Sequence, residues 1–159
     1  MTPQEIHDRL KAQLPGAILD LNAAAITEPW IKIAPDRTKD IGLFLRDTPE
    51  LQFDYLMCLS GVDNNDGTLS TVYHLGSMVH KHRLVLKALV PKDNPQVQSV
   101  ESVWKTANWH EREAYDLLGI VYTEHPDLRR ILCPYDWEGH PLRKDYKLPE
   151  FYNGMKVPY

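Results

Sequence analysis

Three acidic side chains fall within one short stretch, Glu111 to Asp116, and carboxylates are the groups of general acid–base catalysis. On a helix, Glu113 and Asp116 share a face one turn apart, where two carboxylates could move a proton or bind a metal. Arg112, however, precedes Asp116 by four residues and can pair with it, and Glu111 suits the first turn of a helix. We therefore interpret the stretch as a solvated, ion-paired helix face rather than as a catalytic site.

Two basic pairs follow the acidic stretch and indicate docking. Arg129-Arg130 comes after Asp127, which could cap a short turn or bind an arginine, and Arg143-Lys144 lies in a Pro-flanked extended segment. Arginine is favoured in ion pairs that lose water at interfaces. The basic pairs can pair with the acidic helix, bind a partner, or do both. The same region holds aromatic side chains, the usual anchors of protein contacts: Trp109, Tyr115, Tyr122, Tyr135, Trp137 and Tyr146.

Motifs for other chemistry do not occur in the sequence. The histidines and cysteines form no HExxH or zinc-knuckle pattern, and His80 and His82 lack a third metal ligand. No GxSxG, GxxxxGK[ST] or GxGxxG is present. Cys58 and Cys133 have no activating base nearby in the sequence and are interpreted as packing thiols. We expect no metal, no cofactor and no catalytic residue in this chain.

Size and charge place the chain among ordinary single-domain proteins. It has 159 residues, of which 43% are apolar and 25% charged. A net charge of −4 argues against general nucleic-acid binding. The longest apolar run, Tyr55–Leu59, is far shorter than the ~20 residues that span a bilayer. Because there is no secretory leader and no CxxC pair, we expect reduced thiols in a cytosolic setting.

The sequence pattern also predicts the elements that position these groups. A helix is expected from Pro3 to Leu14 with Thr2 as its cap. The strand expected at Phe53–Val62 would place alternate residues, from Phe53 to Leu59, on one face. A turn at residues 63–67 favours an antiparallel meander with the strands that follow. The remaining expected strands are Trp30–Ile33, Ile41–Leu45, Thr68–Met78, His82–Val90 and Ile120–Tyr122.

Two further helices are expected before the Pro-rich end of the chain. Apolar residues at helical spacing predict one over residues 96–107. Asn108 followed by Glu111 resembles a capping arrangement, so the other should begin there and end at Gly119. The fold class is α+β, a mostly antiparallel sheet packed with helices and followed by an irregular Pro-rich C-terminal extension. We expect residues 1–125 to form the core domain and residues 126–159 to form an extended segment that docks on partner subunits.

Two runs of sequence resemble the signature of the C subunit (the thirty-kilodalton subunit) of the proton-pumping NADH:quinone oxidoreductase, respiratory complex I: HEREAYDLLGIVYTEHPDLRRIL and DWEGHPLRKDY. The resemblance is dense over residues 104–146 and looser before them. Leu118 and Glu124 replace residues common in the family, which affects local packing only. In this family the matching positions serve folding and assembly. They are Glu111, Arg112, Glu113, Asp116, Gly119, His125, Pro126, Asp127, Arg129, Arg130, Gly139, Pro141, Arg143, Lys144 and Asp145.

The resemblance implies a soluble subunit without a redox centre, in the hydrophilic arm of the translocase. It implies subunits D and B as partners in the quinone-reducing module, with FMN, iron–sulfur clusters and quinone held by other subunits. It also implies peripheral attachment at the cytoplasmic face of the bacterial cell membrane. Since the sequence stops at Tyr159 without a fused D subunit, we expect the D subunit to be a separate chain.

Two other functions stay open at this point. Related subunits occur in membrane-bound hydrogenases and in complexes that oxidise ferredoxin or a deazaflavin. A free-standing hydrolase that uses Glu113 and Asp116 is the competing class.

Overall fold

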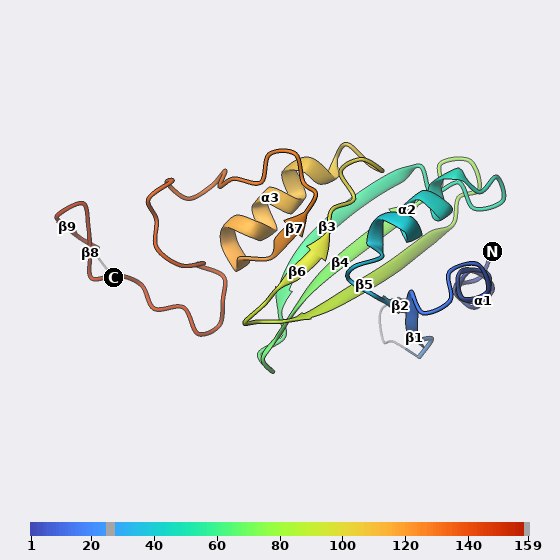
Figure 1. Ribbon diagram of the computed structural model, residues 1–159, viewed down its shortest axis with the longest axis horizontal. Helices are drawn as coiled ribbons and strands as arrows, with labels where there is room; N and C mark the ends of the chain where they lie inside the picture. Colours follow the sequence, from blue (N-terminus) through green and yellow to red (C-terminus); the bar gives the residue numbers. More distant parts are fainter. Residues whose placement is uncertain (25–27, 158–159) are drawn as a thin grey trace.

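The computed structural model describes residues 1–24 and 28–157. A five-stranded sheet, in the order β1-β2-β5-β4-β3, has the helices and the short pair β6-β7 on one face (Figure 1). The helices are α1 (Pro3–Gln13), α2 (Thr38–Asp47) and α3 (Ala107–Leu118). The strands are β1 (Ile18–Asn22), β2 (Trp30–Ile33), β3 (Tyr55–Asp63), β4 (Thr68–Gly76), β5 (Arg83–Pro91), β6 (Gln96–Gln98), β7 (Val121–Thr123), β8 (Phe151–Tyr152) and β9 (Met155–Lys156).

The predicted fold class is confirmed. Strands β3, β4 and β5 form the expected antiparallel meander, β1 pairs antiparallel with β2, and only the β2–β5 pair within this sheet is parallel. Helix α1 begins as expected, because Thr2 and Glu5 form a reciprocal capping box and Pro3 occupies the first turn.

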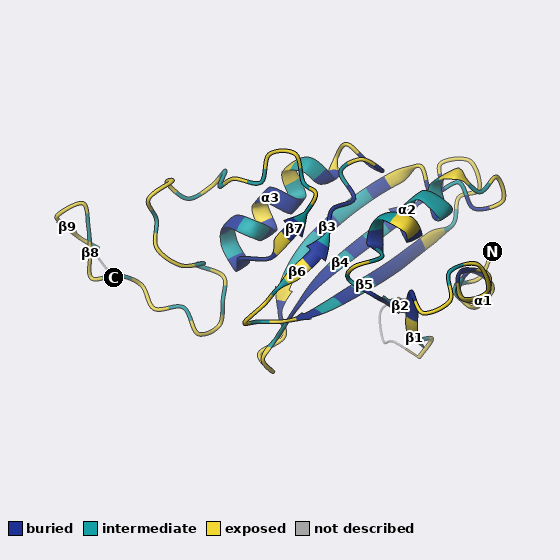
Figure 2. Ribbon diagram, viewed as in Figure 1, coloured by how far each residue is buried: buried dark blue, intermediate teal, exposed yellow. Residues whose placement is uncertain are grey.

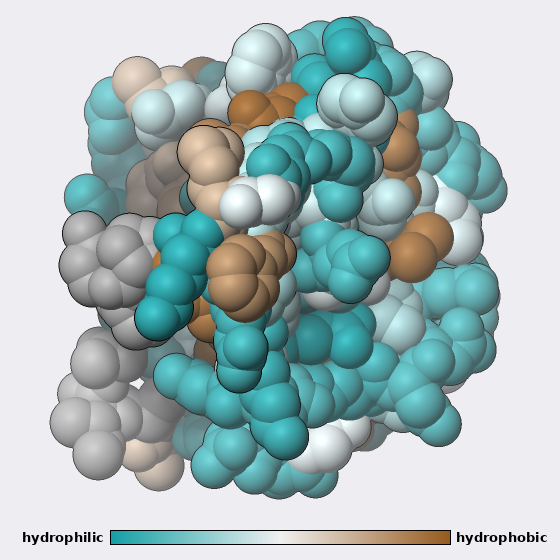
Figure 3. All heavy atoms as spheres, turned by 90° about the vertical axis from the view of Figure 1, so that its left-hand side faces the viewer, coloured by the Kyte–Doolittle hydropathy of each residue, from teal (hydrophilic) through white to brown (hydrophobic). Residues whose placement is uncertain are grey.

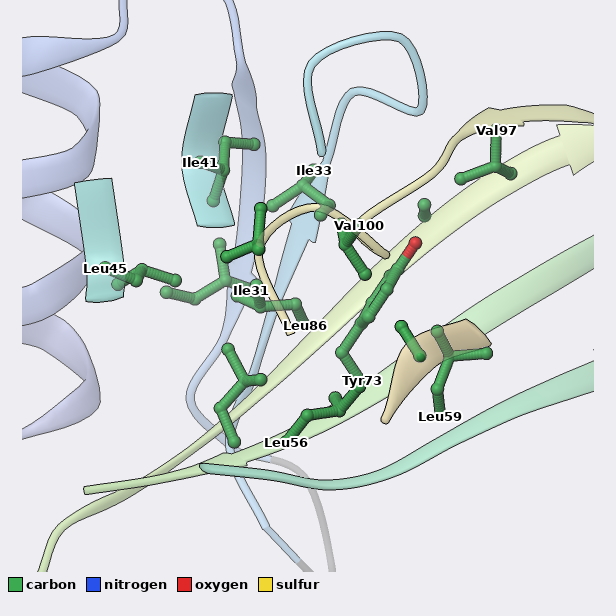
Figure 4. Packing of buried hydrophobic residues seen from close by; sticks show 14 of the residues in the cluster. Ile31, Ile33, Ile41, Leu45, Leu56, Leu59, Tyr73, Leu86, Val97 and Val100 are labelled. Atoms are coloured by element: carbon green, nitrogen blue, oxygen red, sulfur yellow. The ribbon is translucent and has the colours of Figure 1, made fainter. Parts of the chain in front are cut away.

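The strand expected at Ile41–Leu45 is wrong, because these residues lie in α2. A short apolar run cannot by itself distinguish a buried strand from a helix segment. Here Ile41 and Leu45 are one helical turn apart and both are fully buried against the sheet (Figure 4). Gly42 between them allows α2 to approach Trp104, whose ring would be 3.1 Å from an added Cβ.

The helix expected over residues 96–107 is also wrong. Residues 96–98 form β6, which pairs in parallel with β7, and the chain then turns repeatedly before α3. The Gln98 and Ser99 amides donate to the Pro35 and Thr123 carbonyls rather than to a preceding helical turn. The apolar residues that suggested the helix are buried nevertheless and belong to the hydrophobic core.

Strand β3 differs from its prediction in register. A bulge between Leu56 and Cys58 interrupts the alternation, so Leu56 and Leu59 face the core while Tyr55 is 49% exposed. Leu56 and Leu59 lie beside Tyr73 of β4 in the packed interior (Figure 4). Gly61 lets α3 pack closely on the same strand, because an added Cβ would be 2.6 Å from the Leu118 side chain.

The chain beyond β7 leaves the core as a long, mostly irregular segment, which we call the C-terminal extension (residues 126–157). Within the described residues it contains no helix and only the small hairpin β8-β9, which the sequence pattern did not predict. It projects away from the sheet (Figure 1), and most of it is exposed or half-buried where the core elements are buried (Figure 2). The division into domains at residue 125 stays a prediction. Residues 158 and 159, which belong to the predicted segment, lie outside the described residues.

No helix in the described part of the chain is long and apolar enough to cross a membrane.

Candidate functional site

Glu111 is fully buried on the inner side of α3. Its carboxylate accepts hydrogen bonds from the Ser99 hydroxyl (2.6 Å) and the Val100 amide (2.8 Å), and so fixes the turns that precede α3. The predicted capping role is therefore wrong: α3 begins at Ala107, and Glu111 lies beyond its first turn. Burial raises the pKa of Glu111 to about 7, because the two hydrogen bonds offset only part of the desolvation cost.

His125 lies beside Glu111 and its side chain is equally buried, with the Nε2 atom 3.9 Å from the carboxylate. The His125 Nδ1 atom accepts a hydrogen bond from the Asp127 amide (3.0 Å), so the ring proton is on Nε2, which contacts the Asn108 carbonyl (3.2 Å). Glu111 and His125 are thus buried polar side chains whose hydrogen bonds hold the chain on either side of α3, and Pro126 follows His125 directly.

Asp116 is the centre of the site. Its buried carboxylate accepts hydrogen bonds from Arg130 Nη1 (2.7 Å) and from three successive amides of the extension, Ile131 (2.9 Å), Leu132 (2.7 Å) and Cys133 (2.9 Å). Burial alone would raise the pKa of Asp116, but these hydrogen bonds outweigh it and lower the pKa to about 2. A carboxylate engaged in this way is a structural anchor for the extension.

The predicted ion pair between Arg112 and Asp116 does not form. The Arg112 side chain is only 7% exposed and points toward the beginning of the extension, where its Nη1 atom lies 4.0 Å from the Asp127 carboxylate. It also lies over the Trp109 ring and donates to the Arg129 carbonyl (3.4 Å). Asp116 instead pairs with Arg130. One residue of the basic pair Arg129-Arg130 therefore binds the acidic helix, which is one of the predicted alternatives.

A second set of contacts attaches the extension to the C-terminal end of α3. The Arg143 Nε atom donates to the Leu118 carbonyl (2.7 Å), the Leu142 amide donates to the Leu117 carbonyl (3.0 Å), and His140 Nδ1 contacts the Asp116 carbonyl (3.0 Å). The last carbonyls of a helix have no partner within it, and a cation near them also interacts well with the helix dipole. The extension therefore serves as the cap of α3.

A third contact involves Asp63 at the end of β3. Its carboxylate binds Lys92 (2.8 Å) and the Lys144 amide (2.9 Å), and Lys92 also bridges to Asp145 (2.9 Å). The hydrogen bond from Lys92, together with those from the Lys144 and Asn65 amides, lowers the pKa of Asp63 to about 2. Sequence reasoning missed Asp63, which had been assigned to a turn, because its partner Lys144 is 81 residues away.

Gly119 connects the helix end to the extension. It has a φ of +75°, and an added Cβ would lie 2.5 Å from His140 Nε2 and 2.7 Å from Arg143 Nη2. Gly139 also has positive φ (+77°) and lies against the Tyr146 ring, with Pro141 two residues later.

Gly119→Ala should therefore destabilise the chain and loosen the extension. The left-handed backbone alone costs about 1–2 kcal/mol with a side chain, and displacement of His140 and Arg143 adds to it. Gly16→Ala is the matched control, since Gly16 has a φ of +83° with nothing within 4 Å of its added Cβ. Chemical denaturation measures both costs. Equal costs for the two variants would contradict the packing role of Gly119.

Two of the predicted residues stand apart from these contacts. Glu113 is exposed, whereas Asp116 is fully buried and occupied by the extension, so the pair of free carboxylates that the catalytic alternative requires does not exist. Arg129 has a side chain that is 71% exposed and pairs only with Asp127 (2.9 Å) among the described residues. Within residues 1–24 and 28–157, no three histidine, cysteine or acidic side chains come together as metal ligands.

Comparisons with known proteins point to one family. Residues 31–152 match the family described as the respiratory-chain NADH dehydrogenase, 30 Kd subunit. A protein of Chlorobium phaeobacteroides named as the C subunit of NADH-quinone oxidoreductase is 52% identical over 136 residues, which cover 84% of this chain and 82% of the relative. A protein of the same name from Chloroherpeton thalassium is 47% identical over 159 residues and covers 99% of this chain; the chain spans 66% of that relative's length.

Two solved structures share the fold. A trypsin-resistant fragment (1–134) of Nqo5 has a TM-score of 0.63 and 24% identity, covering 80% of this chain and 100% of the fragment. A chain of the membrane-bound sulfane sulfur reductase, an archaeal respiratory membrane complex, has a TM-score of 0.70 and 21% identity, covering 91% of this chain and 85% of that one.

Proposed function

Because the chain belongs to the family of the 30-kDa subunit of respiratory-chain NADH dehydrogenase, we propose that it is the non-redox C subunit of a proton-pumping NADH:quinone oxidoreductase. In this role it holds the quinone-reducing module together with subunits D and B. FMN, iron–sulfur clusters and quinone are bound by other subunits. The complex attaches the chain peripherally to the cytoplasmic face of the bacterial cell membrane.

The observation that carries this proposal is the C-terminal extension, which is attached to α3 and β3 by hydrogen bonds but exposes many of its side chains to solvent. Asp116, Leu118 and Asp63 hold the extension by the hydrogen bonds described above. Along its length the extension presents large apolar side chains to solvent, and hydrophobic groups stand among hydrophilic ones on this side of the molecule (Figure 3). The exposed fractions are 61% for Leu132, 95% for Tyr135, 57% for Leu142, 59% for Phe151 and 65% for Met155. Such a segment has the composition of a docking surface.

Chemistry in the chain itself has little support. The four hydrogen bonds to Asp116 occupy the oxygens that a hydrolase would need for a metal or a water. Glu113 belongs to no cluster of potential metal ligands among the described residues. The likeness to the sulfane sulfur reductase concerns the fold, whereas the relatives with 47% and 52% identity are named for quinone reduction. These findings favour the NADH:quinone complex over related complexes that use other electron donors.

Arg129→Glu tests the docking role. Arg129 is exposed and makes only a surface ion pair, so reversing its charge should cost the isolated chain less than about 1 kcal/mol. At an interface the same change places like charges together, and we expect loss of co-purification with the D subunit. Arg9→Glu is the control, because the Arg9 side chain is 48% exposed and its helix, α1, lies at the opposite end of the molecule from the hairpin β8-β9 (Figure 1). Normal co-purification of Arg129→Glu would count against docking through this segment.

Arg143→Glu is unsuitable for that purpose, although the sequence suggested it equally. Arg143 binds the Leu118 carbonyl, so its replacement would release the extension from its own core before any partner is involved.

A further inference from the structure

The free edge of β3 is unusually open for a sheet edge. β3 ends the strand order of the sheet, and no described residue outside the sheet forms a hydrogen bond with the backbone of residues 55–62. These residues include no charged side chain and no proline. The opposite edge, β1, is short, contains a bulge and carries Asp20, which are features that prevent edge pairing. β3 also has a bulge, between Leu56 and Cys58, but the strand is longer than β1 and carries no charged residue along residues 55–62.

A groove of about 280 Å³ runs beside this edge, between β3 and α3. Its walls are mostly apolar, and His110 and Glu113 supply polar groups. Leu142 of the C-terminal extension also lines the groove, so the groove is continuous with the surface proposed to dock on a partner.

We propose that an extended segment of a partner subunit pairs with the free edge of β3 and adds a strand to the sheet. Only an extended backbone can satisfy a row of amides and carbonyls spaced along a strand. The groove accepts an apolar side chain of that segment. Glu113 is exposed and makes no ion pair with a described residue, so a lysine or arginine of the segment matches it.

A second copy of this chain fits the groove less well. Two copies paired through β3 would bring the two Glu113 carboxylates toward each other, and no described lysine or arginine lines the groove to compensate them. An acidic groove beside an unpaired strand edge therefore favours a different chain with a basic residue.

The inference rests on the proposed assembly role, and amide hydrogen exchange over residues 55–63 tests it. The assembled complex, isolated from cells, is compared with the purified chain. In an antiparallel strand, alternate residues direct their amides to each side. We expect every second amide of β3 to exchange at least about tenfold more slowly in the complex, while the amides bonded to β4 are slow in both samples.

Glu113→Lys should restore rapid exchange at this edge or exclude the chain from the complex. Glu50→Lys is the matched control and should do neither, because Glu50 lies outside the groove. Rapid edge exchange within an assembled complex would overturn the edge inference alone. Absence of the chain from any membrane-bound complex would overturn both the edge inference and the proposed function. Slow edge exchange in the purified chain, together with a doubled mass, would assign the edge to a second copy and contradict our choice of occupant.

Discussion

Asp116→Ala should release the C-terminal extension from the core and expose it to trypsin. The substitution leaves three amides and the Arg130 guanidinium without their common acceptor. Removing one partner of a buried, hydrogen-bonded charge pair costs on the order of 3 kcal/mol. Because α3 also packs on the sheet through other residues, we expect the helix and sheet to persist while the extension becomes mobile. Limited proteolysis should then cut rapidly after Arg129, Arg130, Arg143 and Lys144.

Two companion variants sharpen this result. Asp116→Asn keeps one acceptor oxygen and should give intermediate proteolysis. Asp127→Ala removes a half-exposed carboxylate from the same region and should change the stability far less than Asp116→Ala does. If Asp116→Ala resists trypsin as well as Asp127→Ala does, Asp116 is not the anchor of the extension.

Glu111→Gln should abolish a loss of stability that the unmodified chain undergoes between acid and neutral pH. The pKa of Glu111 is about 7 in the folded chain and near its ordinary value of 4.5 in the unfolded chain. The folded chain thus holds this proton more tightly. Its contribution to stability is complete below pH 4.5 and is lost as the pH rises through 7. The difference between the two pKa values corresponds to about 3 kcal/mol.

Urea denaturation of the two proteins at a series of pH values measures this effect. Glutamine cannot ionise, so the variant does not undergo this loss. The free energy of unfolding of the variant minus that of the original chain should therefore rise by about 3 kcal/mol between about pH 4.5 and 8. Burial also lowers the pKa values of His82 and His140. Because both proteins contain these histidines, their effect cancels when the two free energies of unfolding are subtracted. A difference independent of pH would mean that Glu111 is ionised throughout.

The local sequence predicted the meander and the fold class because the strands β3, β4 and β5 are neighbours joined by short turns. It failed where distant parts of the chain decide the structure. α2 carries a short apolar run, and residues 96–107 carry apolar residues at helical spacing. In both segments the conformation depends on contacts with distant parts of the chain.

The candidate site shows the same division. The sequence identified the residues of the α3 region and the extension but assigned their partners by helical spacing, which suggested Arg112 for Asp116. The actual partner, Arg130, lies 14 residues further along. Likewise, the burial of Glu111 depends on Ser99 and Val100, whose position follows from the β6–β7 pair rather than from any local pattern.

The central claim is that the outer part of the extension lies on a neighbouring subunit, and a photo-crosslinking residue in place of Tyr135 tests it most directly. Tyr135 is 95% exposed and makes no hydrogen bond to a described residue, so the replacement leaves the isolated chain intact. In the assembled complex we expect crosslinks from position 135 to one of the subunits D and B, and none from a matched probe at the exposed Leu19 of β1. A probe at position 135 that reacts only with water in the assembled complex would contradict the claim.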